Sequence, residues 1–350
     1  MAKNKLSFIN RIFFLLNNIF AIALVISFVI PILSPKKYGV FALLSLLTPI
    51  LIIVNFVFVI YWILIGFKKQ LILSFFVLIL SLLFIPSVYK FYNNDADSNK
   101  NSINIMTYNV RKFNKYKWLK IENIESKISE FINEEKPDIL ALQEYKNLKN
   151  FKLEYPYYSN PLKNLYSDPV ENKKYRISQV IFSKYPIINE GLIRHTKLLV
   201  CGMYVDIVKN KDTLRVYNFH LESLGIIPSE DYFGHKDSRK LIKRLSTSFK
   251  AQQRQIDSLN SHIKVCKHKV ILLGDMNNTA YSWAYKNIKN DLQDSFLEAG
   301  KGFGKTYEFK KIPLRIDYIF ADKDIKITNH KNFTEKYSDH YPISATLELK

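Results

Sequence analysis

The first ninety residues contain three long stretches without a charged side chain, and these constrain the fold more than any other feature. They cover residues 12–35, 38–67 and 70–89, and each is rich in Leu, Ile, Val and Phe. A helix needs about 20 apolar residues to cross the hydrocarbon core of a bilayer. We therefore predict three transmembrane helices, at about residues 12–35, 39–66 and 70–89. The alternative is a signal peptide followed by buried helices, but a cleavable signal has one short apolar region without further stretches of this length.

The basic residues that flank these stretches indicate an orientation in the membrane. Two groups would lie on opposite sides of the bilayer, namely Lys3, Lys5, Arg11, Lys68 and Lys69 on one side and Lys36, Lys37 and Lys90 on the other. The side with more Lys and Arg is usually cytoplasmic. We therefore predict a multi-pass membrane protein with a cytoplasmic N-terminus and, after an odd number of spans, an extracytoplasmic C-terminal domain.

The composition changes abruptly after the apolar region. The polar sequence NNDADSNKNS, residues 93–102, predicts a linker between a membrane domain at 1–92 and a second domain at 103–350. The second domain, of roughly 250 residues, is long enough for a single large core. The net charge of +20 favours anionic partners such as nucleic acid or lipid head groups. Cys201 and Cys266 are too few for a thiolate metal site.

Strand-like and helix-like segments alternate along the second domain. Residues 103–110 and 137–144 read as strands, and between them apolar residues recur at helical spacing from Trp118 to Ile132. Further predicted elements are a hairpin of strands at 202–210 and 213–221, a helix at 239–264, and strands at 269–275, 315–322 and 341–349. This order predicts an α/β fold with mixed sheets and intervening helices.

Polar side chains gather where the predicted strands begin or end. These are Asn109, Glu144, His220, Asp275, Asn277, Asp317, Asp339 and His340. Taken singly, each has an ordinary structural role, such as a helix cap or a satisfied core histidine. Together they supply the oxygen ligands that suit a divalent cation, Mg²⁺ first and Mn²⁺ or Ca²⁺ as alternatives. The histidines and amides add donors that a phosphate requires.

Six motifs in the second domain resemble those of one superfamily. TYNVR, PDILALQE, NFHLES, GDMN, RIDYIF and SDHYPI occur in this order between residues 103 and 346. They resemble the ordered motifs of the endonuclease/exonuclease/phosphatase superfamily, which includes deoxyribonucleases, sphingomyelinases and inositol-phosphate phosphatases. The resemblance implies a four-layer sandwich, in which two mixed β-sheets pack face to face with helices outside. It also implies metal-dependent attack of water on a phosphoester.

The resemblance assigns metal binding and water activation to five residues. Glu144 matches the principal metal ligand, with Asn109 beside it and Asp339 near the metal. Asp275 matches the acid that orients or deprotonates the attacking water, and Asn277 matches the amide that steadies the phosphate. Water activation and phosphate placement must occur within one hydrogen-bond radius, which accounts for the short spacing of Asp275 and Asn277.

The remaining matches concern charge on the phosphate. His340 matches an imidazole that meets the phosphoryl oxygen, and Asp317 matches the carboxylate that orients this imidazole. His220 matches an additional histidine of the deoxyribonuclease-like branch, a transition-state donor or leaving-group acid. Arg111 stands where some abasic-site nucleases carry Asp. It either holds a phosphate through its planar guanidinium or pairs with a surface acid.

These features predict a membrane-anchored, metal-dependent phosphohydrolase, with a phosphodiesterase or nuclease as the first expectation. The alternatives are a lipid or sugar-phosphate hydrolase and a non-catalytic binding or scaffold protein with a degenerate site. The basic residues between Arg239 and Arg254 either bind a polyanion or form a solvated helix face. The oligomeric state is left open.

Overall fold

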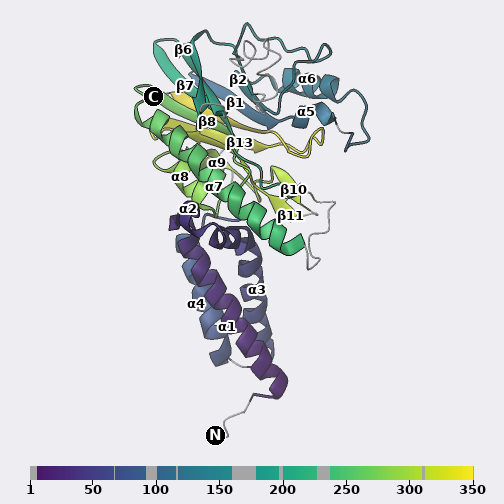
Figure 1. Cartoon of the computed structure of the whole chain (residues 1–350), viewed down its shortest axis with the longest axis vertical. Coiled ribbons are helices and arrows are strands. Elements are labelled where there is room, and N and C mark those ends of the chain that lie inside the picture. Colours follow the sequence, from purple (N-terminus) through teal and green to yellow (C-terminus); the bar gives the residue numbers. More distant parts are fainter. Residues whose placement is uncertain are drawn as a thin grey trace.

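The computed structural model places an α/β domain at one end of a bundle of apolar helices (Figure 1). The described parts of the chain are residues 6–66, 68–91, 101–115, 117–159, 179–196, 200–226, 237–309 and 312–349. The first long helix begins at Phe8, at the end of the bundle far from the α/β domain. Most of the predicted linker at 93–102 falls outside the described residues, namely residues 93–100.

Three long helices form the bundle, and a short connector joins the first two. The long helices are α1 (Phe8–Val29), α3 (Leu44–Leu64) and α4 (Lys68–Phe84). The connector contains the short helices η1 (Ile30–Ile32), α2 (Pro35–Tyr38) and η2 (Phe41–Leu43). The connector lies against the α/β domain, so that α1 and α4 run toward this domain and α3 runs away from it (Figure 1).

The prediction of three helices of spanning length is wrong for the third. Among the described residues, two helical stretches are long and apolar enough to cross a membrane, Phe8–Ile32 and Phe41–Leu64, with hydropathies of 2.5 and 2.7. A signal sequence or a core helix can have the same properties. Helix α4 has 17 residues and ends at Phe84, because Pro86 disfavours the helical conformation at the residue before it. At 1.5 Å per residue this helix is about 26 Å long, less than the ~30 Å of a bilayer core.

Two mixed β-sheets form the centre of the α/β domain. The first has the order β13-β14-β1-β2-β4-β3, with bounds Ile325–Asn332, Ile343–Leu349, Ser102–Asn109, Ile139–Gln143, Val180–Ser183 and Tyr157–Ser159. The second has the order β5-β6-β7-β8-β12-β9, with bounds Ile187–Arg194, Val200–Lys209, Asp212–His220, Lys269–Asp275, Asp317–Ala321 and Gln293–Asp294. Strand β1 is parallel to β2, and β7 is parallel to β8, whereas the other pairs are antiparallel. Strands β10 (Tyr307–Phe309) and β11 (Ile312–Leu314) form a separate hairpin.

The sheets pack face to face, and helices cover their outer faces. One buried cluster joins Ile105 of the first sheet to Val205 and Ile271 of the second. A second cluster packs α6 (Ile124–Glu135) on the first sheet, and a third packs α7 (Asp237–Lys264) and α8 (Trp283–Lys289) on the second. Two short helices, α5 (Arg111–Asn114) and α9 (Ser295–Ala299), complete the domain. This arrangement confirms the predicted pair of mixed sheets flanked by helices.

Two local predictions have different outcomes. The predicted hairpin is confirmed by β6 and β7, which pair from Gly202 to Lys209. The helix predicted from Trp118 onward begins only at Ile124. Asn123 precedes it with a left-handed φ of 53°, and this conformation cannot continue a right-handed helix. The apolar spacing therefore extends beyond the helix itself.

Candidate active site

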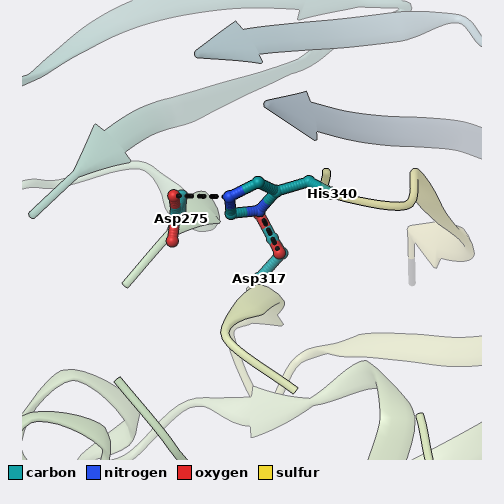
Figure 2. A group of neighbouring side chains, drawn as sticks. All are labelled: Asp275, Asp317 and His340. Carbon is teal, nitrogen blue, oxygen red and sulfur yellow. Dashed lines mark hydrogen bonds and ion pairs between the residues drawn. The ribbon is translucent and has the colours of Figure 1, made fainter. Parts of the chain in front are cut away.

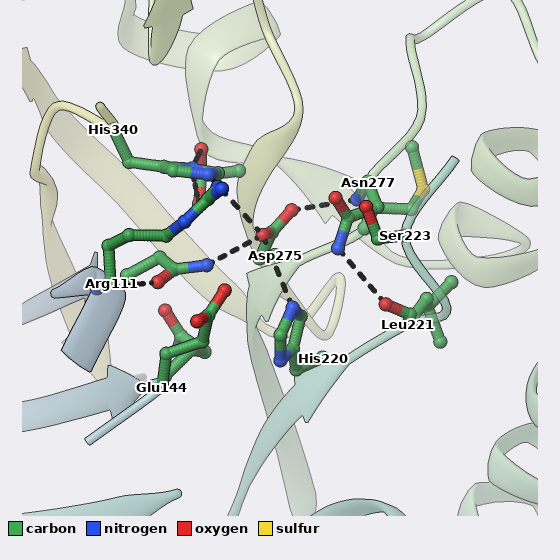
Figure 3. Close-up of polar contacts among 12 residues, drawn as sticks. Arg111, Glu144, His220, Leu221, Ser223, Asp275, Asn277 and His340 are labelled. Carbon is green, nitrogen blue, oxygen red and sulfur yellow. Dashed lines mark hydrogen bonds and ion pairs between the residues drawn. The ribbon is translucent and has the colours of Figure 1, made fainter. Parts of the chain in front are cut away.

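The ends of strands from both sheets meet at one place. In the second sheet, Asp275 ends β8 and lies between His220, the last residue of β7, and Asp317, the first of β12. In the first sheet, Asn109 ends β1 opposite Gln143 of β2, so that Glu144 follows at the same edge. Figure 3 shows the side chains of Arg111, Glu144, His220 and His340 converging on Asp275.

Asp275 is the fully buried centre of this group. Its Oδ2 accepts a hydrogen bond of 2.9 Å from the side-chain amide of Asn109. The Nε2 atoms of His220 and His340 lie 3.6 and 3.7 Å from the same oxygen. Its Oδ1 accepts a hydrogen bond of 2.7 Å from the backbone N–H of Asn277. One buried carboxylate therefore gathers four of the predicted site residues.

His340 and Asp317 form a buried ion pair beside this centre. Nδ1 of His340 lies 3.0 Å from Oδ2 of Asp317 (Figure 2). Burial opposes the charged imidazole, but the carboxylates of Asp317 and Asp275 outweigh it and raise the pKa of His340 to about 10. Burial raises the pKa of Asp317 to about 6, although His340 acts in the opposite direction. At neutral pH the pair is therefore an imidazolium and a carboxylate.

Hydrogen bonds to two other parts of the chain hold Asn277 in place. Its side-chain amide donates to the carbonyl of Leu221, which follows His220, at 3.0 Å. Its own carbonyl accepts from Nε2 of Gln252 in α7 at 3.3 Å. The structure thus places Asn277 next to Asp275, with its amide directed toward the loop after β7.

The remaining predicted residues lie on the other side of Asp275 and carry paired charges. Nη1 of Arg111 lies 2.6 Å from Oδ2 of Asp339, and its guanidinium lies 4.6 Å from the ring centre of Trp118. Nζ of Lys112 lies 4.0 Å from Oε2 of Glu144. Arg111 therefore pairs with an acid of the site itself, whereas the sequence suggested a phosphate or a surface acid.

Three residues of this site have left-handed backbones. The φ angles are 45° at Arg111, 49° at Glu144 and 51° at Asn277. Residues other than glycine rarely adopt this region, and each such residue costs of order 1 kcal/mol or more. Strained residues of this kind cluster where function requires a side chain in one direction.

The side chains here fit a divalent cation. Glu144 and Asp339 offer partly exposed carboxylates, each already next to a cation, and Asn109 adds an amide oxygen. Oxygen ligands of this kind suit Mg²⁺ or Ca²⁺. Within the described ranges, the group whose candidate ligand atoms all lie within 4.8 Å of one another is Asp275, Asp317 and His340. A metal there requires His340 to lose its proton, because only a neutral imidazole binds metal.

Sequence reasoning missed several buried polar residues that support the site. Nε2 of Gln143 donates to Oδ1 of Asn218 at 2.7 Å, and Nδ2 of Asn218 donates to the carbonyl of Leu142 at 3.0 Å. These bonds join the two sheets below the site. Oγ of Ser338 donates to the carbonyl of Asn109 at 2.8 Å and so ties the loop before β14 to β1. The sequence did contain a signal for these supporting residues. Each of them is an uncharged polar residue that lies one or two positions from a predicted site residue.

Comparisons with known proteins agree with the fold of the α/β domain. The solved structure of a functionally unknown conserved protein from Enterococcus faecalis V583 matches with a TM-score of 0.52 and 14% identity, over 71% of this chain and 100% of that one. An endonuclease/exonuclease/phosphatase from Bacteroides vulgatus matches with a TM-score of 0.50 and 18% identity, over 72% of this chain and 100% of that one. At these identities the likeness shows the fold alone. No match was found among the curated proteins.

Two family models match separate parts of the chain. A domain of unknown function (DUF8431) matches residues 10–88, which contain the apolar helices. The model of the Endonuclease/Exonuclease/phosphatase family matches residues 106–340, which contain the whole second sheet, the first sheet except β14 and the start of β1, and every residue of the site described above. Since this match covers more than half of the chain, the protein belongs to the endonuclease/exonuclease/phosphatase family.

Proposed function

We propose that this protein is a metal-dependent phosphodiesterase anchored in a membrane by its N-terminal helices. The observation that carries the proposal is the buried Asp275 carboxylate, which is surrounded by Asn109, His220, Asn277 and the imidazolium of His340. A buried carboxylate that faces several donors is poised to orient water beside a bound phosphate. Family membership supports phosphoester hydrolysis as the reaction.

Positive groups on two sides of the site stabilise the negative charge of the phosphate. Glu144, with Asn109 and Asp339, would hold a divalent cation, which would neutralise charge on the phosphate and make water more acidic. His340 donates from Nε2 to a phosphoryl oxygen as charge develops on it. Asp317 accepts from Nδ1 and so keeps this ring charged and in one orientation.

Asp275 and His220 carry out the two proton transfers of the proposed reaction. Asp275 orients the attacking water and accepts its proton, since its carboxylate is the acceptor toward which the surrounding donors point. His220 lies on the opposite side of Asp275 from Asp317 along the strand ends. It protonates the leaving oxygen of the phosphodiester. Asn277 positions Asp275 through its backbone N–H, while its side-chain amide donates to the carbonyl of Leu221.

The surface of the helical bundle supports membrane anchoring. Large apolar side chains face outward, including Phe8, Leu64 and Leu82, whose exposed fractions are 77%, 80% and 81%. Polar side chains lie inside instead, where Oγ of Ser74 donates to Oδ1 of Asn55 at 2.7 Å and Nε1 of Trp62 donates to Oδ1 of Asn17 at 3.2 Å. Water disfavours such a surface, whereas a bilayer favours it. Helices α1 and α3 then cross the bilayer, and the shorter α4 packs against them within the bundle.

Nucleic acid is the first substrate to test, because the chain carries a net charge of +20. A phospholipid head group is the second, because the catalytic domain lies directly at the end of the bundle. Lys90, shortly after α4, exchanges two backbone hydrogen bonds with Gly302, at 2.9 and 2.8 Å. This contact keeps the domain beside the place where α4 leaves the bilayer.

A substrate panel on the full chain in detergent micelles tests the proposal. DNA, RNA, a phospholipid and a sugar phosphate are each assayed with Mg²⁺ and with a chelator. We expect hydrolysis of at least one phosphodiester, its loss with the chelator and its return with Mg²⁺. Binding of a phosphoester without turnover, in any divalent metal, would favour the scaffold alternative. Hydrolysis of monoesters alone would replace the phosphodiesterase with a phosphatase.

A further inference from the structure

The N-terminal half of α7 carries exposed basic side chains at the junction of the bundle and the catalytic domain. Arg239, Lys240, Lys243 and Arg244 are all exposed. Figure 1 shows this end of α7 reaching the level at which α3 meets the domain. The catalytic site uses none of these residues.

An apolar stripe on α7 packs against the bundle and so fixes the position of α7 along the bundle axis. Leu241, Leu245 and Phe249 recur every four residues and pack with Ala42 and Leu46 around the start of α3. Residues spaced in this way lie on one face of a helix. The exposed basic side chains are interleaved with this stripe, so they lie within about one helical turn of the contact with α3.

Polar contacts hold the connector between α1 and α3 against the same helix. Oε1 of Gln253 accepts hydrogen bonds from Oγ of Ser34 at 2.9 Å and from the backbone N–H of Lys36 at 2.8 Å. Nζ of Lys36 lies 2.7 Å from Oδ2 of Asp257. The next residue, Lys37, is exposed. These bonds join the connector to α7 as one unit, so Lys37 and the α7 cations surround the same end of the bundle.

We infer that Lys37, Arg239, Lys240, Lys243 and Arg244 form a docking surface for the anionic head groups of the bilayer. Four of these residues lie on α7 and Lys37 lies on α2 beside it; we call the five together the α7 basic face. The inference rests on the proposed membrane anchoring, because the bundle then places this face at head-group level. Cations attract an anionic leaflet only within about a Debye length, roughly 10 Å. The packing of α7 on the start of α3 keeps the face within this range.

This docking bears on the orientation of the active site. Nε2 of Gln252, on the same helix, donates to the carbonyl of Glu222 at 2.8 Å and to that of Asn277 at 3.3 Å. The helix that meets the bilayer is thus bonded to the loops after β7 and β8. Contact of the α7 basic face with lipid therefore holds the catalytic site at one angle to the membrane surface.

Thermal unfolding of the full chain in lipid nanodiscs tests this inference. One set of discs contains phosphatidylcholine alone, and the other contains two parts of phosphatidylcholine to one of phosphatidylglycerol. We expect the anionic discs to raise Tm by about 4 °C, and about 0.5 M NaCl to remove most of the difference. R239Q/K243Q should lose the shift. The double variant K127Q/K152Q should keep it, because Lys127 lies on α6, at the far end of the domain (Figure 1), and the carbonyl of Lys152 accepts from Asn133 of α6.

Several outcomes would overturn the inference. These are an equal Tm in both kinds of disc, a shift that survives in R239Q/K243Q, or a shift that K127Q/K152Q also loses. A single-stranded oligonucleotide that raises Tm in phosphatidylcholine discs, through Arg239 and Lys243, would reassign the face to nucleic acid. Phosphoester hydrolysis by the same variants in detergent reports separately on the proposed reaction, and R239Q/K243Q should retain it.

Discussion

The side-chain amide of Asn109, at the end of β1, donates a hydrogen bond of 2.9 Å to the carboxylate of Asp275, at the end of β8 in the opposite sheet. This bond crosses the interface between the two sheets at the candidate site. The site therefore exists only when the sandwich is closed. The apolar cluster between the sheets provides the closure, and the buried pair of Gln143 and Asn218 fixes its alignment just below.

Asp275→Asn should remove most activity while leaving the fold intact. The substitution keeps the shape of the side chain but removes the acceptor that orients water and balances the charge of His340. We expect kcat on the active substrate to fall by about 10²-fold or more, with a smaller change in KM. Asp291→Asn is the matched control, because Asp291 is exposed and pairs only at the surface with Lys323. Equal rates for the wild type and Asp275→Asn would remove Asp275 from the mechanism.

His340→Gln should lower turnover more than binding, because the imidazolium acts mainly on charge that develops in the transition state. A loss of about 10²-fold in kcat is expected for one such donor. Asp317→Asn should reproduce much of this loss, since the carboxylate 3.0 Å away orients the ring. A double variant no worse than His340→Gln alone would show that both act as one unit. Fully additive losses would contradict the proposed pair.

Glu144→Gln should change the metal requirement more than the limiting rate. A neutral amide binds a hard cation more weakly than a carboxylate does, so more Mg²⁺ should be needed for half-maximal activity. Lys112→Gln should act in the opposite direction, because Nζ of Lys112 lies 4.0 Å from Glu144 and repels a cation there. Titration of Mg²⁺ against activity measures both. An unchanged requirement in both variants would place the metal elsewhere, for example at Asp275, Asp317 and His340.

His330 should destabilise the domain in mild acid. Its Nδ1 lies 2.8 Å from Oγ of Ser295, and burial lowers the pKa of His330 to about 4. In the unfolded chain its pKa is about 6.5, so below this pH the unfolded state binds a proton that the folded state excludes. Stability is therefore lost as pH falls from about 6.5 toward 4, by about 3 kcal/mol in total.

The pH dependence of His330→Gln tests this expectation. The variant should have a lower Tm at pH 7.5 but should lose less stability than the wild type between pH 7.5 and 5. The raised pKa of His340 affects the wild type and the variant alike, because its stabilisation is complete below about pH 6.5 and declines in both as pH rises from there toward about 10. Parallel curves for the wild type and the variant would contradict the account of His330.

The strand-end residues could be predicted from the sequence because they depend on local pattern and on chain order. Asp275 and His220 end strands that short apolar runs define, and the parallel pairing of β7 with β8 then brings them together. The position of Arg111 could not be predicted in this way. It depends on a left-handed turn with φ values of 45–54° from Arg111 to Asn114, and apolar patterning carries no information on such a turn.

In the helical bundle, too, some features could not be predicted from the sequence pattern. Hydropathy located all three helices but did not mark the end of α4 at Phe84, because the apolar stretch continues to Tyr89; Pro86 is the sequence signal for this end. The inward direction of Asn17 and Asn55 depends on how the three helices pack. Packing follows from contacts between distant residues, and a single hydropathy profile does not contain them.

The orientation of the chain in the membrane is the last expectation. In the bundle, the start of α1 and the catalytic domain lie at opposite ends (Figure 1), and the flanking Lys and Arg residues favour a cytoplasmic N-terminus. We expect protease added to cells with a permeabilised outer layer to cut within residues 93–102, because polar linkers are preferred cleavage sites, and a fragment of roughly 250 residues should then appear on a denaturing gel. A cytoplasmic protein should stay intact in the same cells as a control. Appearance of the fragment only after lysis of the inner membrane would reverse the orientation, and it would leave the bundle as the anchor and the chromosome as an accessible substrate.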